Sequence, residues 1–270
     1  MINQKIEIAS GNQKRQLAYT ESGNPLSQNI IFCIPGILET KDTFEPLHEC
    51  AIRCTDVHIV SIDICGRGQS SPLGHGENYR MSVYLKDIQF LISEIIHAKD
   101  TKYSNPINIY LVGTSMGGIL TLYLHQGLGN QIKGICLNDI GLTLKWLSIF
   151  ELSKPISNSK VSLQELAEKL KVSPEVLTDV QRNEHFDLPY KSDLIGMHFY
   201  PLLDHFNGTL LLIYGGHSVI CTSDVVLEIK LRFPKSHQLK INDSKHPVTL
   251  NQEISKEILK KFKLIESSSI

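Results

Sequence analysis

The sequence lacks several features that would point away from a globular enzyme. No segment approaches the ~18 consecutive apolar residues that a membrane-spanning helix requires, and residues 1–8 have no apolar core of the signal-peptide kind. No long run carries charge of one sign, and 27 basic against 28 acidic residues leave a formal net charge of −1, which argues against a nucleic-acid partner. We therefore expect a soluble, cytoplasmic protein that acts on a small molecule, without nucleic acid or membrane insertion. The oligomeric state stays open.

The six cysteines show no C-x-x-C pair and no Cys/His cluster with zinc spacing. Cys33 and Cys136 lie inside apolar, strand-like runs, where a cysteine usually acts as a small hydrophobic residue. Cys50 and Cys54 lie one helical turn apart, which would hold a metal only with further ligands. We expect structural thiols, no metal and no organic cofactor.

Apolar β-like runs alternate with helical patterns along most of the 270 residues, which suffice for one domain with a sizeable core. This alternation predicts a mainly parallel α/β sheet with helices on both faces. The first two runs predict an antiparallel hairpin through the turn Ser10-Gly11-Asn12. The eight strand candidates are residues 6–9, 16–20, 29–34, 58–63, 107–112, 133–137, 209–214 and 237–241. The helix candidates are residues 43–53, 82–97, 116–127, 222–233 and 251–264.

Residues 141–206 interrupt the alternation, because they contain no convincing strand. Two helix starts lie within them: Ser162-Leu163-Gln164-Glu165 has the pattern of a capping box, and Ser173-Pro174 places proline at the first helical position. We predict that residues 1–140 and 207–270 form the core. Residues 141–206 are predicted to form a helical cap over the C-terminal edge of the sheet, where such folds bind ligands.

The apolar run at residues 108–112 ends in Gly113-Thr114-Ser115-Met116-Gly117, a Gly-x-Ser-x-Gly pattern that a helical pattern follows. A serine on such a tight strand-to-helix turn projects its hydroxyl clear of the sheet, and the flanking glycines prevent collisions across the turn. The N-terminus of the following helix would face any negative charge that develops on a substrate. The pattern predicts Ser115 as a nucleophile.

Four motifs follow the third to sixth strand candidates: Cys33-Ile34-Pro35-Gly36-Ile37-Leu38, Asp63-Ile64-Cys65-Gly66-Arg67-Gly68-Gln69-Ser70, Gly113-Thr114-Ser115-Met116-Gly117-Gly118 and Leu137-Asn138-Asp139-Ile140-Gly141. In this order they resemble the loops of the α/β-hydrolase family, in an esterase-like branch, over nearly the whole chain. Pro35 stands where the family usually has histidine. The resemblance implies an eight-stranded α/β-hydrolase sheet with a helical cap after the sixth strand, and a serine hydrolase. Within the second motif we expect Arg67 to be structural and Asp63 to brace the turn.

The resemblance also implies a base histidine after the last strand, and His246 in Asp243-Ser244-Lys245-His246-Pro247 occupies that place. Histidine suits the role because its ordinary pKa lies near 7, so it can take a proton from serine and pass it to the leaving group.

The third member of the triad is the difficulty. The family usually carries its acid in the loop after the seventh strand, and this chain has Val219 there. We take Asp139 after the sixth strand as the candidate acid, because the resemblance implies that this strand lies beside the seventh. Two alternatives stay open: Asp224 or Asp243 reaches His246, or no acid exists and the serine–histidine pair is slow.

The working hypothesis is acyl transfer through a covalent serine intermediate. Ser115 attacks an ester or thioester carbonyl, and His246 acts first as base and then as acid. The main-chain N–H groups of Ile37 and Met116 would bind the oxyanion, whereas Pro35 has no N–H to contribute.

A second hypothesis, from a different class, is a ligand-binding or regulatory protein that kept the hydrolase pocket and lost efficient turnover, because Val219 replaces the usual acid. The sequence does not identify the substrate. The aromatic and methionine side chains of the predicted cap are candidates for lining its site: Trp146, Phe150, Met197, Phe199 and Tyr200.

Overall fold

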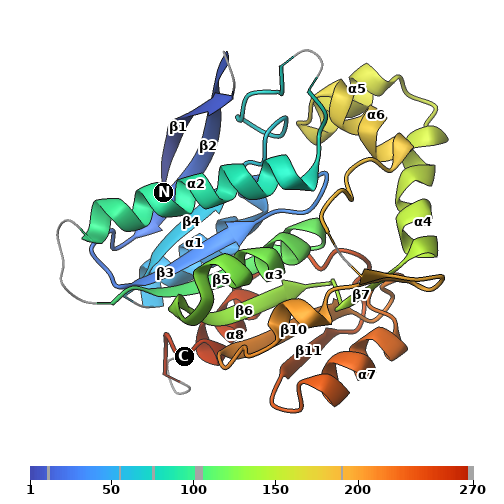
Figure 1. The fold of residues 1–270 in the computed structure, drawn as a ribbon. Coiled ribbons are helices and arrows are strands. Elements are labelled where there is room, and N and C mark those ends of the chain that lie inside the picture. The colour runs from blue at the N-terminus through green and yellow to red at the C-terminus, as the bar shows by residue number, and fades with distance from the viewer. Residues whose placement is uncertain (11–12, 55, 75–76, 101–105, 190, 267–270) are drawn as a thin grey trace.

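The computed structural model describes the chain except residues 11–12, 55, 75–76, 101–105, 190 and 267–270. Its strands are β1 (Ile2–Ser10), β2 (Gln13–Gly23), β3 (Asn29–Ile34), β4 (His58–Ile62), β5 (Asn108–Thr114), β6 (Ile132–Asn138), β7 (Thr143–Lys145), β8 (Lys191–Ser192), β9 (Gly196–His198), β10 (Thr209–Gly215) and β11 (His237–Ile241). Eight of them form one sheet in the order β1-β2-β4-β3-β5-β6-β10-β11 (Figure 1). Strand β2 runs antiparallel to both of its neighbours, and the other neighbouring strands pair in parallel.

Helices cover both faces of this sheet (Figure 1). The helices of the described chain are α1 (Glu45–Cys54), α2 (Met81–Asp100), α3 (Met116–Leu128), α4 (Trp146–Ser157), α5 (Leu163–Leu170), α6 (Pro174–Arg182), α7 (Ser223–Arg232) and α8 (Gln252–Lys261). Short 3-10 turns lie at Lys41–Phe44, Gly129–Gln131 and Tyr200–Leu203. Side chains of α2, α3 and α7 join the core on one face, and those of α1 and α8 form the core on the other.

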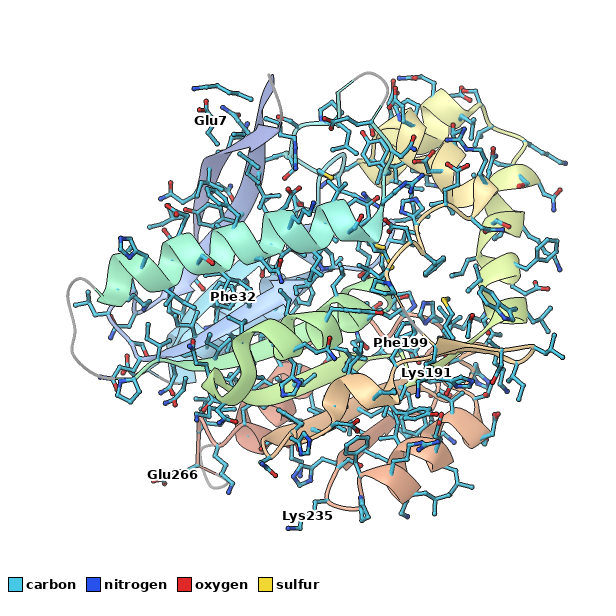
Figure 2. The ribbon with its side chains drawn as sticks, viewed as in Figure 1. Glu7, Phe32, Lys191, Phe199, Lys235 and Glu266 are labelled. Atoms are coloured by element: carbon cyan, nitrogen blue, oxygen red, sulfur yellow. The ribbon has the colours of Figure 1, made fainter. Side chains whose placement is uncertain are left out.

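Coverage on both faces explains why the central strands are apolar along their length. In β5, every residue after Asn108 is buried. Figure 2 shows the fully buried Phe32 of β3 in the interior, whereas Glu7, Lys235 and Glu266 project at the periphery. The C-terminal ends of β5 and β6 are thereby held rigidly side by side, because Thr114 pairs with Asn138.

The eight predicted strands correspond to the eight strands of this sheet, with ends that differ by a few residues. The predicted hairpin is the antiparallel pair β1–β2, and Gly11 and Asn12 of its turn lie outside the described residues. The five predicted helices correspond to α1, α2, α3, α7 and α8. The fold class is a mostly parallel eight-stranded α/β sheet with helices on both faces, as predicted.

The expectation that residues 141–206 contain no strand is wrong. Strands β7, β9 and β8 form a small antiparallel sheet there. Helices α5 and α6 begin where the two start signals predict, and Ser162 and Glu165 form the reciprocal bonds of a capping box. Helix α4 was not predicted as a separate element. Figure 1 shows α4, α5 and α6 gathered at one end of the molecule, beyond α2 and α3.

Main-chain hydrogen bonds join this segment to the Gly66–Gly68 turn of the core. The N–H of Gly68 donates to the carbonyl of Lys171 (2.6 Å), and the N–H of Ser173 donates to the carbonyl of Gly66 (2.7 Å). These bonds fix the loop between α5 and α6 against the core.

The same turn is braced by Asp63, as predicted. Its two carboxylate oxygens accept the N–H groups of Lys41 (2.8 Å) and Gln69 (2.9 Å). Asp63 is fully buried, so these bonds replace the water it loses.

Five cysteines are buried, as expected of structural thiols: Cys33, Cys50, Cys65, Cys136 and Cys221. Of these, Cys33, Cys65, Cys136 and Cys221 are free of disulfides. The side chain of Cys54 is outside the described part of the structure. Within the described ranges, no helix has the combined length and apolar composition needed to cross a bilayer.

Candidate active site

Ser115 lies on the tight turn between β5 and α3, with φ 50° and ψ −118°. Glycine is required on both sides of it. A Cβ on Gly117 would lie 2.1 Å from the carbonyl oxygen of Ile34, and a Cβ on Gly113 would lie 2.5 Å from that of Gly117. The turn therefore closes only because these positions lack side chains. The hydroxyl of Ser115 is left at the C-terminal edge of the sheet.

His246 follows β11 and bridges Ser115 and Asp139. Its Nε2 lies 3.0 Å from Ser115 Oγ, and its Nδ1 lies 3.0 Å from Asp139 Oδ2. Because an ionised carboxylate only accepts, Nδ1 carries the proton and donates to Asp139. Nε2 is then free to accept the Ser115 hydroxyl. The structure thus brings together three side chains from three separate parts of the sequence.

Asp139 follows β6 directly, in the left-handed region at φ 55°. It is fully buried, and its N–H donates to the carbonyl of Ile213 on β10 (2.7 Å). Its Oδ1 accepts the N–H of Gly215 (3.4 Å). Asp139 is therefore held both by its place after β6 and by its hydrogen bonds to β10. Burial, and secondarily Asp139, raise the pKa of the nearby Cys221 thiol well above its ordinary value.

The other carboxylates considered do not reach the histidine ring. Asp224 forms an ion pair with Lys145 (2.6 Å) on the surface, and Asp243 is exposed. Val219 is 63% exposed, so its side chain faces solvent. Of the three hypotheses for the acid, only the one that names Asp139 agrees with the geometry.

The two predicted oxyanion donors border one small apolar cavity at Ser115. Within the described part of the chain, the N–H groups of Ile37 and Met116 have no hydrogen-bond acceptor. The cavity is about 10 Å³, close to the ~10–15 Å³ that one water molecule needs. Its lining is Ile37, Ser115, Met116, Ile119, Ile140, Leu144, Leu152, Phe186 and Ile220.

The aromatic and methionine side chains predicted to line the substrate site do not line this cavity. Trp146 and Phe150 are 39% and 57% exposed on the outer side of α4, and Met197 and Phe199 are buried in the core. The ring of Tyr200 lies against Arg232, whose guanidinium is 3.6 Å from the ring centre. The 141–206 segment instead contributes Leu144, Leu152 and Phe186. The aromatic character of a residue did not by itself indicate whether its side chain faces the cavity, because α4 carries apolar residues on both of its sides.

Sequence reasoning missed Glu39. Its Oε2 accepts the N–H of Gly36 (2.8 Å), and a Cβ on Gly36 would lie 2.9 Å from that oxygen and 3.5 Å from Ser115 Cβ. Burial raises the pKa of Glu39, an effect that the Gly36 hydrogen bond and His246 oppose. The signal was present as an acid three residues after a loop glycine, which is the spacing of a reciprocal capping interaction.

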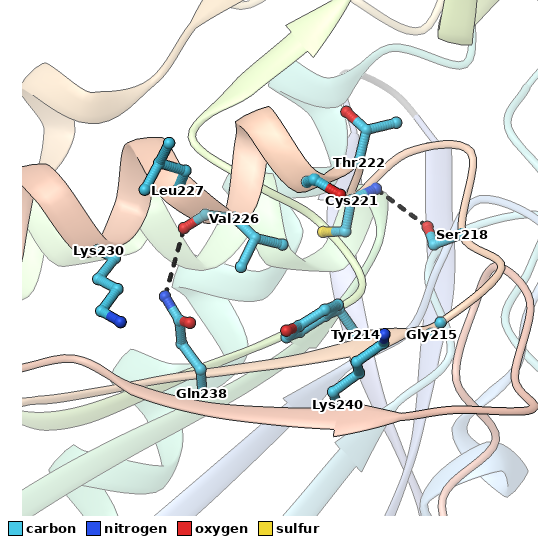
Figure 3. Close-up of a pocket in the computed structure, with 12 residues that line it drawn as sticks. Tyr214, Gly215, Ser218, Cys221, Thr222, Val226, Leu227, Lys230, Gln238 and Lys240 are labelled. Carbon is cyan, nitrogen blue, oxygen red and sulfur yellow. Dashed lines mark hydrogen bonds between the residues drawn. The ribbon is translucent and has the colours of Figure 1, made fainter.

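A separate cavity of about 450 Å³ lies between β10, β11 and α7 (Figure 3). Gly215 and Cys221 form part of its wall, and Figure 3 shows the N–H of Cys221 donating to Ser218 Oγ (3.0 Å). None of the candidate catalytic side chains lines it, so it is not the site described above.

Comparison with known proteins agrees with the fold. The sequence model of a family described as "Serine aminopeptidase, S33" matches residues 27–219. The chain belongs to this family of α/β hydrolases. It is a hydrolase.

Two solved structures illustrate the similarity of fold. One is an α/β hydrolase from Novosphingobium aromaticivorans, with 17% identity, a TM-score of 0.69, and coverage of 97% of this chain and 99% of that one. The other is a thermophilic esterase from Thermogutta terrifontis, with 14% identity, a TM-score of 0.70, and coverage of 96% and 98%.

A curated relative is the 3-hydroxybutyrate-oligomer hydrolase of Cupriavidus necator, which is 28% identical over 126 residues. The similarity covers 47% of this chain and 39% of the relative. The chain therefore matches well under half of that protein's length.

Proposed function

We propose that the protein is a serine hydrolase that cleaves a small carboxylic ester or thioester through an acyl-enzyme. The observation that carries the proposal is the continuous chain of two 3.0 Å contacts from Ser115 through His246 to Asp139.

In the first step, Ser115 Oγ attacks the acyl carbonyl while its proton passes to His246 Nε2. Asp139, which accepts a hydrogen bond from the Nδ1–H of His246 without taking its proton, stabilises the imidazolium. Collapse of the tetrahedral intermediate breaks the bond to the leaving alcohol or thiol, which takes the proton from His246. Water then attacks the acyl-enzyme with His246 as base, releasing the acid and restoring Ser115.

The negative oxygen of both tetrahedral intermediates would accept the N–H groups of Ile37 and Met116. A donor of this kind contributes roughly 3–4 kcal/mol to transition-state stabilisation in a dry, rigid site.

The apolar side chains around Ser115 favour an apolar acyl group, which has to displace some of them because the cavity as it stands holds about one water molecule. Apart from the serine hydroxyl, its lining side chains are all apolar, so a charged or strongly polar acyl group would lose hydration there without compensation. The relative named a 3-hydroxybutyrate-oligomer hydrolase is consistent with short acyl units. The family description names an aminopeptidase, but binding a free α-ammonium requires an acceptor. Glu39, the nearby carboxylate, already accepts the N–H of Gly36 through Oε2.

The alternative is a binding or regulatory protein without efficient turnover, which Val219 at the family's usual acid position suggests. A carboxylate 3.0 Å from His246 Nδ1 removes that reason. No other feature of the described residues favours the alternative.

The test is a panel of p-nitrophenyl esters from acetate to octanoate, assayed with the wild type, Ser115→Ala and His246→Ala. We expect many turnovers per molecule of wild type on the shorter esters, and losses of at least about 1,000-fold in kcat for both variants. A single stoichiometric release of nitrophenol would favour the binding protein. Turnover that survives Ser115→Ala would exclude the mechanism. An alanine p-nitroanilide, assayed in parallel, should be cleaved more slowly than the butyrate ester.

A further inference from the structure

The turn formed by residues 36–39 passes directly against the nucleophile. The Cβ distances of Gly36 place it within contact range of both Ser115 and Glu39, and Ile37 borders the cavity at Ser115. The direction of the Ile37 N–H therefore depends on how firmly this turn is held.

Glu39 closes the turn from both of its ends. Its carboxylate accepts the N–H of Gly36 (2.8 Å), while its own N–H donates to the carbonyl of Gly36 (3.2 Å). The Gly36 N–H is thereby occupied, whereas the next N–H along the chain, that of Ile37, has no acceptor among the described residues. Glu39 itself is half-buried.

Arg67 holds the middle of the turn. Its Nε donates to the carbonyl of Ile37 (3.0 Å), and its Nη1 donates to the carbonyl of Cys65 (2.8 Å). The guanidinium also lies 4.7 Å from the centre of the Tyr84 ring, a favourable cation–π position.

The setting of Arg67 is unusual for a cation. It is fully buried, and none of the ion pairs found in the described chain includes it. Burial of a charge without a counter-ion is costly. Loss of the guanidinium would also leave the carbonyls of Ile37 and Cys65 without these donors. Two main-chain carbonyls and an aromatic face compensate part of this charge, while Nη2 is buried without a hydrogen-bond partner among the described residues.

From this arrangement we propose that Glu39 and Arg67 are positioning residues that hold the 36–39 turn so that the Ile37 N–H faces the developing oxyanion. The inference rests on the proposed function, because the Ile37 N–H binds an oxyanion only if the protein catalyses acyl transfer. It differs from a general structural role because it predicts an effect on the transition state rather than on ground-state binding.

Two conservative variants of Glu39 separate reach from charge. Glu39→Gln keeps an oxygen acceptor at the same reach and removes the charge. Glu39→Asp keeps the charge and withdraws the acceptor by about one C–C bond, ~1.5 Å. We expect Glu39→Asp to lower kcat by roughly 10–100-fold with KM changed less than about threefold, because part of one oxyanion donor is lost. Glu39→Gln should retain kcat within about threefold.

The matched control is Glu45→Asp, an exposed glutamate in the first turn of α1, which should behave as wild type. A second readout is the rate of labelling by a fluorophosphonate, whose phosphoryl oxygen enters the same oxyanion site. This rate should fall in Glu39→Asp in proportion to kcat. Far-UV circular dichroism and the melting temperature establish that each variant is folded.

Arg67→Lys provides an independent arm, because lysine keeps the charge but cannot donate to two carbonyls in a fixed fork. It should also lower kcat more than it raises KM. The proposal is overturned if folded Glu39→Asp and Arg67→Lys both keep kcat within threefold of wild type, or if Glu39→Gln loses as much as Glu39→Asp. If either of these results is found and Ser115→Ala is inactive, the proposed function stands and only the positioning role of Glu39 and Arg67 is overturned. An active Ser115→Ala would overturn both the proposed function and the positioning role.

Discussion

At the scale of single residues, Ser115 has a backbone conformation, at φ 50°, that residues other than glycine rarely adopt. Such strain costs on the order of 1–3 kcal/mol and persists only where the surroundings determine it. Here the Ser115 N–H donates to the carbonyl of Asn138 (2.9 Å), and the carbonyl of Ser115 accepts the N–H of Gly118 (2.9 Å). The turn that exposes the hydroxyl is thus stabilised by the neighbouring strand and by its own helix.

Asp139 illustrates what the sequence could and could not specify. Residue types and motifs predicted Ser115 and His246 directly, whereas Asp139 was one of three hypotheses for the acid and was preferred for its expected place beside the seventh strand. The choice depends on which strands are neighbours, because β6 lies beside β10 only in the folded sheet. Glu39 was missed for a similar reason: its proximity to Ser115 depends on β3 and β5 being adjacent.

Asp139→Asn should lower kcat at least about 100-fold on any ester the protein cleaves, because the amide cannot hold the Nδ1 proton and stabilise an imidazolium. Steady-state kinetics measure the loss. Adding Val219→Asp to this variant should not restore activity, since the side chain at position 219 faces solvent. A rate for Asp139→Asn near that of wild type, or recovery in the double variant, would mean that another group serves as the acid.

At the scale of elements, alternation of strand and helix patterns was enough to predict the main sheet, and two capping signals located α5 and α6. The strands β7, β8 and β9 are two or three residues long, too short to show a period of two. Helix α4 contains Pro155 and carries apolar side chains on opposite sides, such as the exposed Leu147 and the buried Ile149. The apolar residues of its sequence therefore do not mark a single buried face.

Two glycines of α3 provide a matched test of how tightly the nucleophile helix packs. Gly117→Ala should destabilise the protein by roughly 2 kcal/mol or more and reduce activity, because the new Cβ would lie 2.1 Å from the Ile34 carbonyl oxygen. Gly127→Ala, where the nearest atom is 3.7 Å away, should be neutral or stabilising by up to about 1 kcal/mol. Urea unfolding measures both. Equal effects would show that close packing does not constrain Gly117.

His48 of α1 ties that helix to the sheet, since its ring nitrogens lie 2.6 Å from Ser22 Oγ and from Ser61 Oγ. Burial lowers the pKa of His48 from 6.5 to about 4. Between these values the unfolded chain binds the proton and the folded chain does not, so stability falls as the pH drops through this window.

From pH 7.5 to pH 5, this one group should remove about 2 kcal/mol from the free energy of unfolding. In His48→Gln the decrease should be smaller by that amount, whatever the variant's stability at pH 7.5. Urea unfolding at the two pH values gives the difference directly. Parallel losses in wild type and variant would mean that His48 does not titrate as described.

At the scale of the whole molecule, the site forms where the 141–206 segment meets the C-terminal edge of the main sheet. Leu144, Leu152 and Phe186 of this segment approach Ser115 across the cavity, and the bonds to the Gly66–Gly68 turn fix the segment on one side. The proposed cap boundaries, residues 141 and 206, lie just after the end of β6 and just before the start of β10. On this account the segment limits the size of the acyl group.

Two leucines of α4 test that role. Leu152→Ala should enlarge the cavity and raise the ratio of kcat/KM for hexanoate over acetate esters by roughly 10-fold, since apolar pockets discriminate by about 1–3 kcal/mol for small changes of fit. Leu147→Ala, which is 69% exposed in the wild type, should leave the ratio unchanged. A shift in the second variant, or none in the first, would place the acyl group elsewhere.

The most direct measurement of the central claim is covalent labelling of the wild-type protein with a fluorophosphonate, followed by peptide mass spectrometry. The account predicts one label per chain, located on Ser115, with labelling abolished by Ser115→Ala and strongly slowed by His246→Ala. A label on another residue, or undiminished labelling of Ser115→Ala, would contradict it.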